Sequence, residues 1–389
     1  MPDEDTEVKT LEDLAPVIEL YHHMVGAGNL DEAKKLYEDR LANPIYFQFS
    51  AYHLEIELLR ALFLDGEDKT PRLKKEFDQV DTLNNFANDY ANSGQSRHAV
   101  PLFEMVNRLL EKAGDKKNLA IGLGNVSTEQ LVIGALSEAE RNLRRRIGLC
   151  REIADEFNEA IGHYGLALVL IYRGEWDNAF DELDVCMKQA EIQKHIQIQH
   201  MVWAYRAQCN LLRMRDTVKS TTNDLEFAIK FAKNALASAE DWAKTKYPMK
   251  RDYVRAHWLL GAAYCANNEL TLAEENLSKA LNLCRQINMV DHEADILLDV
   301  ARLRYAQGDF KDAQEKASEA LVITERSGYV LQGADVHLFL AQYALEQEKD
   351  KAKAKAYAEE ARKLATCDGP PYYYKVAYEE AERFLENLK

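Results

Sequence analysis

Few residues of this chain have the types and spacing that catalysis or nucleotide binding requires. The sequence contains no Gly-Lys dipeptide, so it lacks the phosphate-binding loop of P-loop proteins. Gly122-Leu123-Gly124 begins like a dinucleotide-binding fingerprint, but Ser127 stands where the third glycine should be. The pattern around it is helical throughout, whereas that fingerprint needs a strand followed by a helix. We interpret these glycines as the close crossing of two helices.

Histidines and cysteines also lack the spacing of a metal or redox site. His22-His23, His195 and His200 have no second ligand at metal-binding spacing. No C-x-x-C pair occurs among the cysteines, which are Cys150, Cys186, Cys209, Cys265, Cys284 and Cys367. Most of them stand in helical, apolar surroundings, which predicts free buried thiols in a reducing cytosol. The sequence therefore predicts a cytoplasmic protein that is not an enzyme and binds no metal or cofactor.

Charge and hydropathy exclude two further classes of partner. The formal net charge is −16, and an acidic chain repels the phosphate backbone of nucleic acids. The longest apolar run, at about 165–172, is far shorter than the roughly 18 residues of a membrane span. The first ten residues are acidic and polar, unlike a signal peptide. We expect neither nucleic-acid nor membrane binding.

The most informative pattern is a repeat with a step of 40 residues. Ala99, Ala139 and Ala179 are separated by this step, and so are Ala273 and Ala313. A small residue precedes each alanine by twelve positions: Ala87, Ser127, Ala167, Gly261 and Ala301. Self-similarity of this period indicates stacked two-helix units, each of which buries its apolar face on the next.

Helical periodicity divides the chain into a series of elements. We expect a disordered tail (1–10), N-terminal helical repeats (11–72) that include a long helix at about 45–64, repeats proper (73–369), and a capping helix (370–389). The expected pairs are 73–94/96–112, 116–132/135–155, 157–173/175–192, 195–214/222–243, 250–266/269–286, 290–306/309–326 and 330–347/350–366. Extra residues at 213–223 predict an irregular corner that bulges out of the stack. Pro370 and Pro371 end the last pair.

The repeat resembles the tetratricopeptide repeat. Ala99 and Phe103 fit its Ala-x3-Phe pattern, and Gly174 and Gly308 stand where such repeats turn. The step of 40 departs from the usual period of about 34 residues. The resemblance implies an all-α, right-handed superhelical solenoid of about eight long helix pairs with a C-terminal capping helix.

The resemblance also implies a ligand-binding groove lined by the first helix of each pair. In these repeats, positions 2, 5, 9, 12 and 13 of that helix face the groove. Counting the small residue as position 8, we predict ten groove residues: Asn84, Asn88, Tyr164, Tyr172, Tyr205, Gln208, Arg255, Trp258, Arg302 and Tyr305. Aromatic residues and arginine dominate binding hot spots. The alternative for any one of them is packing against a neighbouring helix. Asn84 and Asn88 resemble the asparagine pair with which some of these domains hold a peptide, although the lysine partners of a carboxylate clamp are missing.

A run of arginines offers a competing anion site. Arg141, Arg144, Arg145 and Arg146 could hold a phosphate or a carboxylate, because guanidinium groups match both. The run lies on a second helix between Glu138 and Glu152, so we interpret it as a solvated face with i,i+4 ion pairs.

Longer phrases resemble the C-terminal repeat region of bacterial and archaeal STAND ATPases, which are NLR-like signalling and defence proteins. The most specific are IELLRALFLDGEDKTPRLKKE (56–76), GDKKNLAIGLGN (114–125) and CDGPPYYYKVAYEEAERFL (367–385). The resemblance implies a sensor that holds an NTPase module inactive until a ligand, often a protein, binds. That module is absent from this chain, so it would act in cis in a longer protein or in trans.

Two other functions remain open from the sequence. A Rap-like peptide receptor has the same architecture and size, and it would carry an N-terminal helical bundle or a DNA-binding module. A constitutive assembly scaffold would bind its partner without a trigger. In all three cases the predicted partner is a protein or peptide in the concave groove.

Overall fold

The protein is all-α. The computed structural model describes residues 8–245 and 248–388, and every regular element in these ranges is a helix. Consecutive helices pack as pairs, which confirms the prediction of a tetratricopeptide-like solenoid. The chain divides into two compact units, one ending at Asp115 and the other beginning at Lys116. Most of the predicted disordered tail, 1–10, lies outside the described residues.

The N-terminal unit is built from short helices followed by one regular pair. Its helices are α1 (Ala15–Gly26), α2 (Leu30–Arg40), α3 (Tyr52–Arg60), α4 (Glu76–Asn92) and α5 (Ser96–Ala113), with a 3-10 turn at Leu11–Leu14 and a π turn at Pro44–Gln48. The predicted long helix at 45–64 is wrong. Ser50 has φ 49°, in the left-handed region, so the chain breaks there and α3 starts two residues later.

The loop at 65–72, at the end of the predicted N-terminal repeats, lies inside this unit. Arg72 pairs with Asp65 at 2.5 Å, so the loop folds back on itself. Leu73 is buried and the Lys74 amide donates to Asp31 on α2 at 2.9 Å. A break in the helical pattern therefore marks a folded loop here, and the two units separate about forty residues later.

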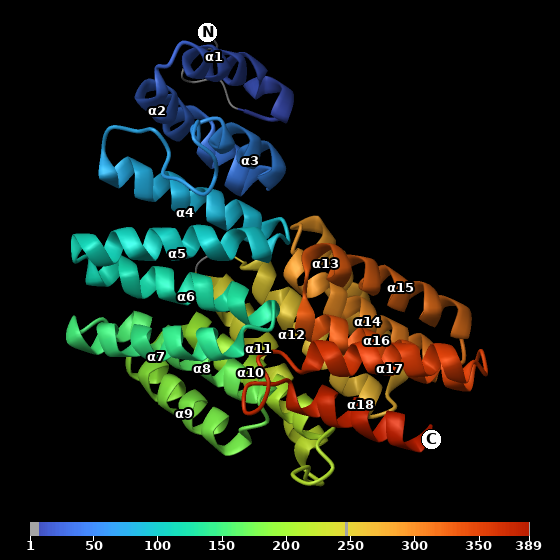
Figure 1. Ribbon diagram of the computed structural model, residues 1–389. Helices are drawn as coiled ribbons and strands as arrows, with labels where there is room; N and C mark the ends of the chain where they lie inside the picture. Colours follow the sequence, from blue (N-terminus) through green and yellow to red (C-terminus); the bar gives the residue numbers. More distant parts are fainter. Residues whose placement is uncertain (1–7, 246–247, 389) are drawn as a thin grey trace. The chain divides into compact units, whose positions relative to one another are not determined.

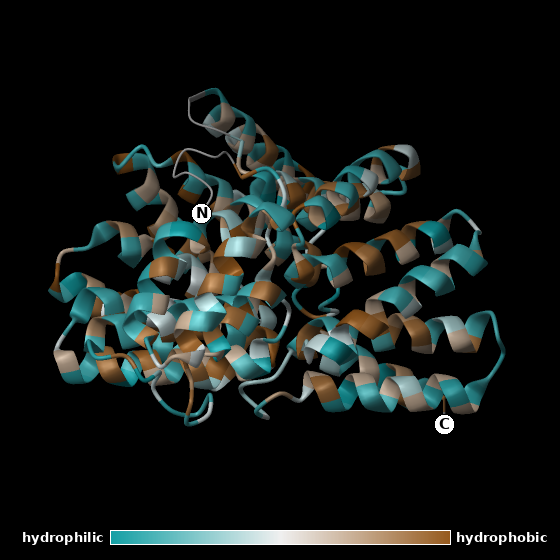
Figure 2. Cartoon of the chain, turned by 90° about the horizontal axis from the view of Figure 1, so that it is seen from above, coloured by the Kyte–Doolittle hydropathy of each residue, from teal (hydrophilic) through white to brown (hydrophobic). Residues whose placement is uncertain are grey.

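The C-terminal unit contains six helix pairs and a last single helix. They are α6 (Lys116–Val132), α7 (Leu136–Glu152), α8 (Glu156–Tyr172), α9 (Trp176–Ile192), α10 (Ile196–Arg213), α11 (Asp224–Thr245), α12 (Lys250–Ala266), α13 (Leu270–Gln286), α14 (Val290–Ala306), α15 (Phe310–Ser327), α16 (Val330–Glu346), α17 (Lys351–Ala365) and α18 (Lys375–Asn387) (Figure 1). These bounds lie within a few residues of the predicted pairs. Apolar and polar residues alternate along the helices, as Figure 2 shows, so that one face of each can be buried against a neighbour.

Small residues mark the helix crossings, as the repeat predicts. The five alanines at the 40-residue step are fully buried: Ala99, Ala139, Ala179, Ala273 and Ala313. At Gly261 an added Cβ atom would lie 2.7 Å from the Leu277 side chain, so α12 and α13 can approach only because this position has no side chain. The periodic positions therefore set the distance between the helices of a pair.

The loop between α10 and α11, where the sequence predicts an irregular corner, is exposed at 217–223 and has a buried anchor at Asp216. Asp216 in this loop is 1% exposed and accepts a hydrogen bond from Trp176 Nε1 at 2.9 Å. Its carboxylate also pairs with Lys375, at the start of α18, at 2.8 Å. Asp216 thus turns inward and joins this loop to the start of the last helix, whereas Val218 is 81% exposed.

The segment before α18 makes further contacts with the first pairs of the same unit. The Ser137 amide donates to Asp368 at 2.9 Å, and Arg173 Nε donates to the Pro371 carbonyl at 3.1 Å. Arg173 also lies over the Tyr372 ring, 4.4 Å from its centroid. Repeats of a simple solenoid contact only their neighbours. Here the last segment returns to the beginning of the unit, so that α18 does more than cap the final pair.

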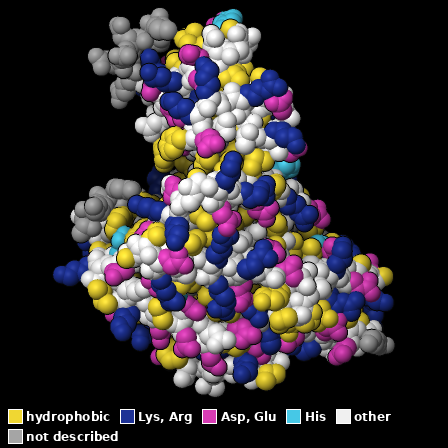
Figure 3. Space-filling model, turned by 60° about the vertical axis from the view of Figure 1, so that its left-hand side comes forward, with side chains coloured by type: hydrophobic (Ala, Val, Ile, Leu, Met, Phe, Trp, Pro, Cys, Tyr) yellow, Lys and Arg dark blue, Asp and Glu magenta, His cyan; other side chains and the backbone are white. Residues whose placement is uncertain are grey.

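Charged side chains are spread over the visible surface, and most of the cysteines are buried. Lys and Arg side chains are interspersed with Asp and Glu over the face that Figure 3 presents. All six cysteines are free; Cys150, Cys186, Cys209 and Cys284 are buried, and Cys265 and Cys367 are half-buried. In the described part of the chain, no helix is long and apolar enough to cross a membrane.

Candidate ligand-binding cavity

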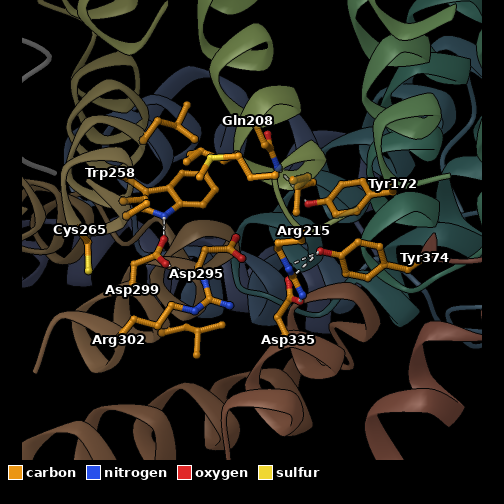
Figure 4. A pocket seen from close by; sticks show the side chains of 17 residues that line it. Tyr172, Gln208, Arg215, Trp258, Cys265, Asp295, Asp299, Arg302, Asp335 and Tyr374 are labelled. Carbon is orange, nitrogen blue, oxygen red and sulfur yellow. Dashed lines mark hydrogen bonds and ion pairs between the residues drawn. The ribbon is translucent and has the colours of Figure 1, made fainter. Parts of the chain in front are cut away.

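The first helices of five pairs in the C-terminal unit surround a cavity of about 440 Å³. It is lined from α8, α10, α12, α14 and α16, and by Tyr374 of the segment before α18 (Figure 4). Cavities of roughly 300–1,000 Å³ are typical of small-ligand sites. The segment before α18 therefore supplies part of the cavity wall.

Helical spacing places the lining residues. On α12, Trp258, Ala262 and Cys265 follow one another at four and three residues, and therefore share one face of the helix. Asp295 and Arg302, two turns apart on α14, do the same. Gly261 faces Leu277 of the partner helix α13, which leaves the neighbouring positions of α12 free to line the cavity.

One wall holds a carboxylate whose hydrogen bonds are well satisfied. Asp299 accepts from the Trp258 indole nitrogen at 2.7 Å and from Arg302 Nη1 at 2.8 Å. Trp258 and Asp299 are both 8% exposed. Burial lowers the pKa of Arg302, but the opposite charge of Asp299 outweighs this effect and raises it. This ion pair fixes the indole ring as part of the cavity wall.

The opposite wall is held by Arg215, which follows α10. Its guanidinium pairs with Asp335 of α16 at 2.7 Å and with Glu380 of α18 at 2.6 Å. It also donates to the Tyr374 hydroxyl at 3.2 Å, which in turn donates to Asp335 at 2.9 Å. Burial disfavours the charge, yet the two carboxylates raise the pKa of Arg215 well above its ordinary value. Arg215 thus joins three elements that lie far apart in sequence.

Asp295 is the cavity carboxyl that lacks a cation. In the described residues its one hydrogen bond is from Gln332 Nε2, at a long 3.4 Å. Burial is the largest cause that raises its pKa well above the ordinary value, and the like charges of Asp299 and Asp335 add to it. Figure 4 shows the side chain between Trp258 on one side and Arg215 on the other. A cationic group of a ligand would complement this position.

Some of the residues predicted to line a groove line the cavity, and others lie elsewhere. Tyr172, Gln208, Trp258 and Arg302 line the cavity, where Gln208 Nε2 donates to the Tyr172 hydroxyl at 3.1 Å. Tyr305 instead packs: its ring contacts Phe310, Phe339 and Tyr343, and its hydroxyl accepts from Gln347 at 2.9 Å.

The other predicted residues lie outside the cavity lining. Tyr164 and Tyr205 are half-buried on α8 and α10, with ring centroids 5.7 Å apart, and Arg255 is buried on α12. Asn84 and Asn88 are half-buried on α4 of the N-terminal unit.

Sequence reasoning missed Asp295, Asp335, Arg215 and Tyr374. The first could have been found, because counting Ala301 as position 8 puts Asp295 at position 2 of the same groove register. Arg215 lies after the end of α10, and Tyr374 lies just before the start of α18. Neither residue is part of a helix, so no helical register could place them.

The structure partly corrects our interpretation of the arginine run as a solvated face. Arg144 is exposed and pairs with Glu140 at 2.9 Å, as predicted for a solvated face. Arg146 instead is 5% exposed and donates to the Asn158 side chain at 3.0 Å. A Cβ atom added at Gly124 would overlap the Arg146 guanidinium. Gly124 therefore makes room for a buried arginine, a finer role than the close helix crossing expected above.

No group of three or more His, Cys, Asp or Glu side chains suited to a metal ion occurs within residues 8–245 and 248–388.

Comparison with known proteins supports the fold. A family model described as Tetratricopeptide repeat matches residues 252–326, which span most of α12 to α15. No protein with a curated description matches the sequence. The chain is thus an all-helical protein with tetratricopeptide repeats.

Similar solved structures include two Rap proteins. One is the Rap conjugation gene regulator of plasmid pLS20 in complex with the Phr* peptide, at 11% identity and TM-score 0.61, covering 97% of this chain and 98% of that one. The second is a Rap protein complexed with competence and sporulation factor, at 14% identity and TM-score 0.55, covering 97% of each chain. A STAND protein with a tetratricopeptide repeat sensor, from Pyrococcus horikoshii, matches at 16% identity and TM-score 0.40, covering 92% of this chain and 53% of that one.

Proposed function

We propose that this chain is a receptor for a short peptide, of the Rap-like type, and that it binds without catalysing a reaction. The peptide occupies the cavity of the C-terminal unit and places a basic group against Asp295. The single observation that carries the proposal is this half-buried carboxyl, which has one long hydrogen bond and no cation in a largely apolar cavity.

The chemistry of the walls fits a peptide. Trp258, Tyr172 and Leu298 offer apolar surface to side chains, and aromatic residues of this kind are the usual anchors of binding hot spots. Gln208 offers an amide oxygen that a peptide N–H can reach, because its Nε2 already donates to Tyr172. A basic side chain or a free amino terminus would then replace the missing cation at Asp295 and relieve its repulsion by Asp299 and Asp335.

The fold comparisons favour a peptide receptor over the sensor of a STAND ATPase. Both Rap structures match nearly the whole chain, and they are complexes with the Phr* peptide and with competence and sporulation factor. At 11% and 14% identity they support the architecture, and the peptide is our extension to this chain. The STAND match, at TM-score 0.40, adds no support for an NTPase partner in cis or in trans.

Affinity selection tests the proposal. The full chain is incubated with a random pentapeptide library, and retained peptides are identified by mass spectrometry. We expect retained peptides to be intact and rich in Lys or Arg, and Asp295→Asn to bind them at least about tenfold more weakly, since a charge-assisted contact contributes roughly 1.5–3 kcal/mol.

The matched control is Arg144→Ala, which removes an exposed arginine on α7 outside the cavity lining and should leave binding unchanged. Equal binding by the wild type and Asp295→Asn would contradict the proposed site. Retention of no peptide would contradict the proposed function, and cleaved peptides would contradict binding without catalysis.

A further inference from the structure

A second group of polar side chains lies close to the cavity on the same helices. Tyr164 is two turns before the cavity residue Tyr172 on α8, Tyr205 is one turn before Gln208 on α10, and Arg255 is one turn before Trp258 on α12. The rings of Tyr164 and Tyr205 are in contact, with centroids 5.7 Å apart. The positive charge of Arg255 acts on both hydroxyls. We call these three residues the Arg255 cluster.

Arg255 is a buried guanidinium with incomplete hydrogen bonding. It is 8% exposed, and its Nε has no hydrogen-bond partner among the described residues. Nη1 lies 3.2 Å from the Met201 sulfur, a weak acceptor, and 3.6 Å from Asp252 Oδ1, too far for a hydrogen bond. A buried charged group without a full set of hydrogen bonds is destabilising, so it needs an explanation such as a ligand.

Nearby arginines do not share this state. Burial raises the pKa of Asp291, but Arg251 and His292 outweigh it, so the pKa lies well below the ordinary value and the carboxylate is charged. It pairs with Arg251 at 2.8 Å. Arg146 has a side-chain partner in Asn158 at 3.0 Å. Arg255 is thus the guanidinium in this region that still lacks a well-placed acceptor.

The two tyrosines add hydroxyl donors without partners. Neither hydroxyl forms a hydrogen bond with another described residue, although both side chains keep part of their surface open. Burial raises the pKa of Tyr164 and of Tyr205, so both hydroxyls keep their protons at neutral pH. The charged side chains that act on the Tyr164 hydroxyl are Arg146 and Arg255, and both are positive. On the Tyr205 hydroxyl the positive Arg255 has the largest charge effect, followed by the negative Asp291, which is already paired with Arg251. Two neutral donors beside a guanidinium form a site for an anion.

We infer that the Arg255 cluster binds the C-terminal carboxylate of the peptide whose basic group faces Asp295. This inference rests on the proposed function and adds an orientation to it. A carboxylate can accept from the guanidinium and from both hydroxyls, because its two oxygens have about four acceptor positions. The opposite charges of Asp295 and Arg255 would exclude the reversed peptide.

The experiment uses the random pentapeptide library in two forms, with a free C-terminal carboxylate and with a C-terminal amide. The inference predicts that the full-length wild type retains the free acids at least about tenfold better than the amides. Tyr164→Phe with Tyr205→Phe keeps the rings, removes the two donors, and should reduce this ratio to about threefold or less. Asp295→Asn, in contrast, should weaken binding of both forms and keep the ratio.

The outcomes separate this inference from the proposed function. Equal retention of acids and amides would overturn the carboxylate site and leave the peptide receptor standing. Enrichment of Asp or Glu at an internal position, with no effect of amidation, would overturn the C-terminal assignment in favour of a side-chain carboxylate. If the wild type retains neither form, the proposed function itself fails.

Discussion

Both units of the protein bury carboxyl groups, but they do so in different surroundings. In the N-terminal unit, Glu55 of α3 and Asp89 of α4 are 2% and 0% exposed, and the Tyr37 hydroxyl donates to Glu55. In the C-terminal unit, the half-buried Asp295 opens onto a cavity. The first two are enclosed by protein, whereas the third can be reached by a ligand.

Burial raises the pKa of these carboxyl groups in both units. It is the largest cause that raises the pKa of Asp89 to about 10 and that of Glu55 to about 7, and the nearby charge of Glu55 adds to the shift of Asp89. At neutral pH this pair therefore holds a proton. Asp295 also has a raised pKa, from burial and from two like charges. The difference teaches that a perturbed carboxyl indicates a binding site only where it also borders open space.

The largest effect is expected where the cavity wall depends on a single cation. Arg215→Ala removes the partner of Asp335 and Glu380 and the donor to Tyr374. Loss of one member of a buried ionic network leaves uncompensated charge, so we expect a loss of about 3 kcal/mol in the free energy of unfolding. Urea unfolding followed by tryptophan fluorescence measures it, because all four tryptophans lie in the C-terminal unit.

Arg144→Ala is the control for this measurement, since that arginine is exposed and should change stability by less than about 0.5 kcal/mol. A loss of the same small size in Arg215→Ala would show that the returning C-terminal segment is held by other contacts.

An intermediate effect is expected at the enclosed pair. Because the pKa of Asp89 is raised in the folded state, its contribution to stability is fully present below its unfolded value of about 4 and is lost as the pH rises towards 10. Between pH 5 and pH 8 the N-terminal unit should lose on the order of 1 kcal/mol or more. Asp89→Asn carries no charge, and should reduce this loss by at least half.

Hydrogen exchange of the α3 and α4 amides, corrected for intrinsic rates at each pH, reports this change. Amides of α12 and α14 serve as the internal reference, because Asp89→Asn should leave their pH dependence unaltered. An unchanged pH dependence in α3 and α4 would mean that the pair exchanges its proton with no consequence for folding.

Sequence alone predicts the periodic part of this protein well. Alanines such as Ala139 and Ala273 must be buried because a repeat of fixed period has one crossing geometry, and each is fully buried. Trp258 and Arg302 follow from the same register and line the cavity. Non-periodic contacts could not be predicted in this way. The pairing of Asp216 with Lys375 joins residues 159 positions apart, and no local pattern encodes it.

The smallest effect, and the one that separates the two kinds of buried carboxyl most directly, is expected at Asp295. Its raised pKa means that ionisation disfavours folding as the pH rises, so Asp295→Asn should stabilise the C-terminal unit at pH 8 by up to about 1 kcal/mol. Asp299→Asn is the matched comparison: it removes the charge that pairs with Arg302 at 2.8 Å and should destabilise the unit. Both are measured from urea midpoints by tryptophan fluorescence. If Asp295→Asn destabilises as much as Asp299→Asn, then Asp295 serves the fold. If it stabilises the fold and weakens peptide binding, the carboxyl is retained at a cost in stability, as expected of a residue whose partner arrives with the ligand.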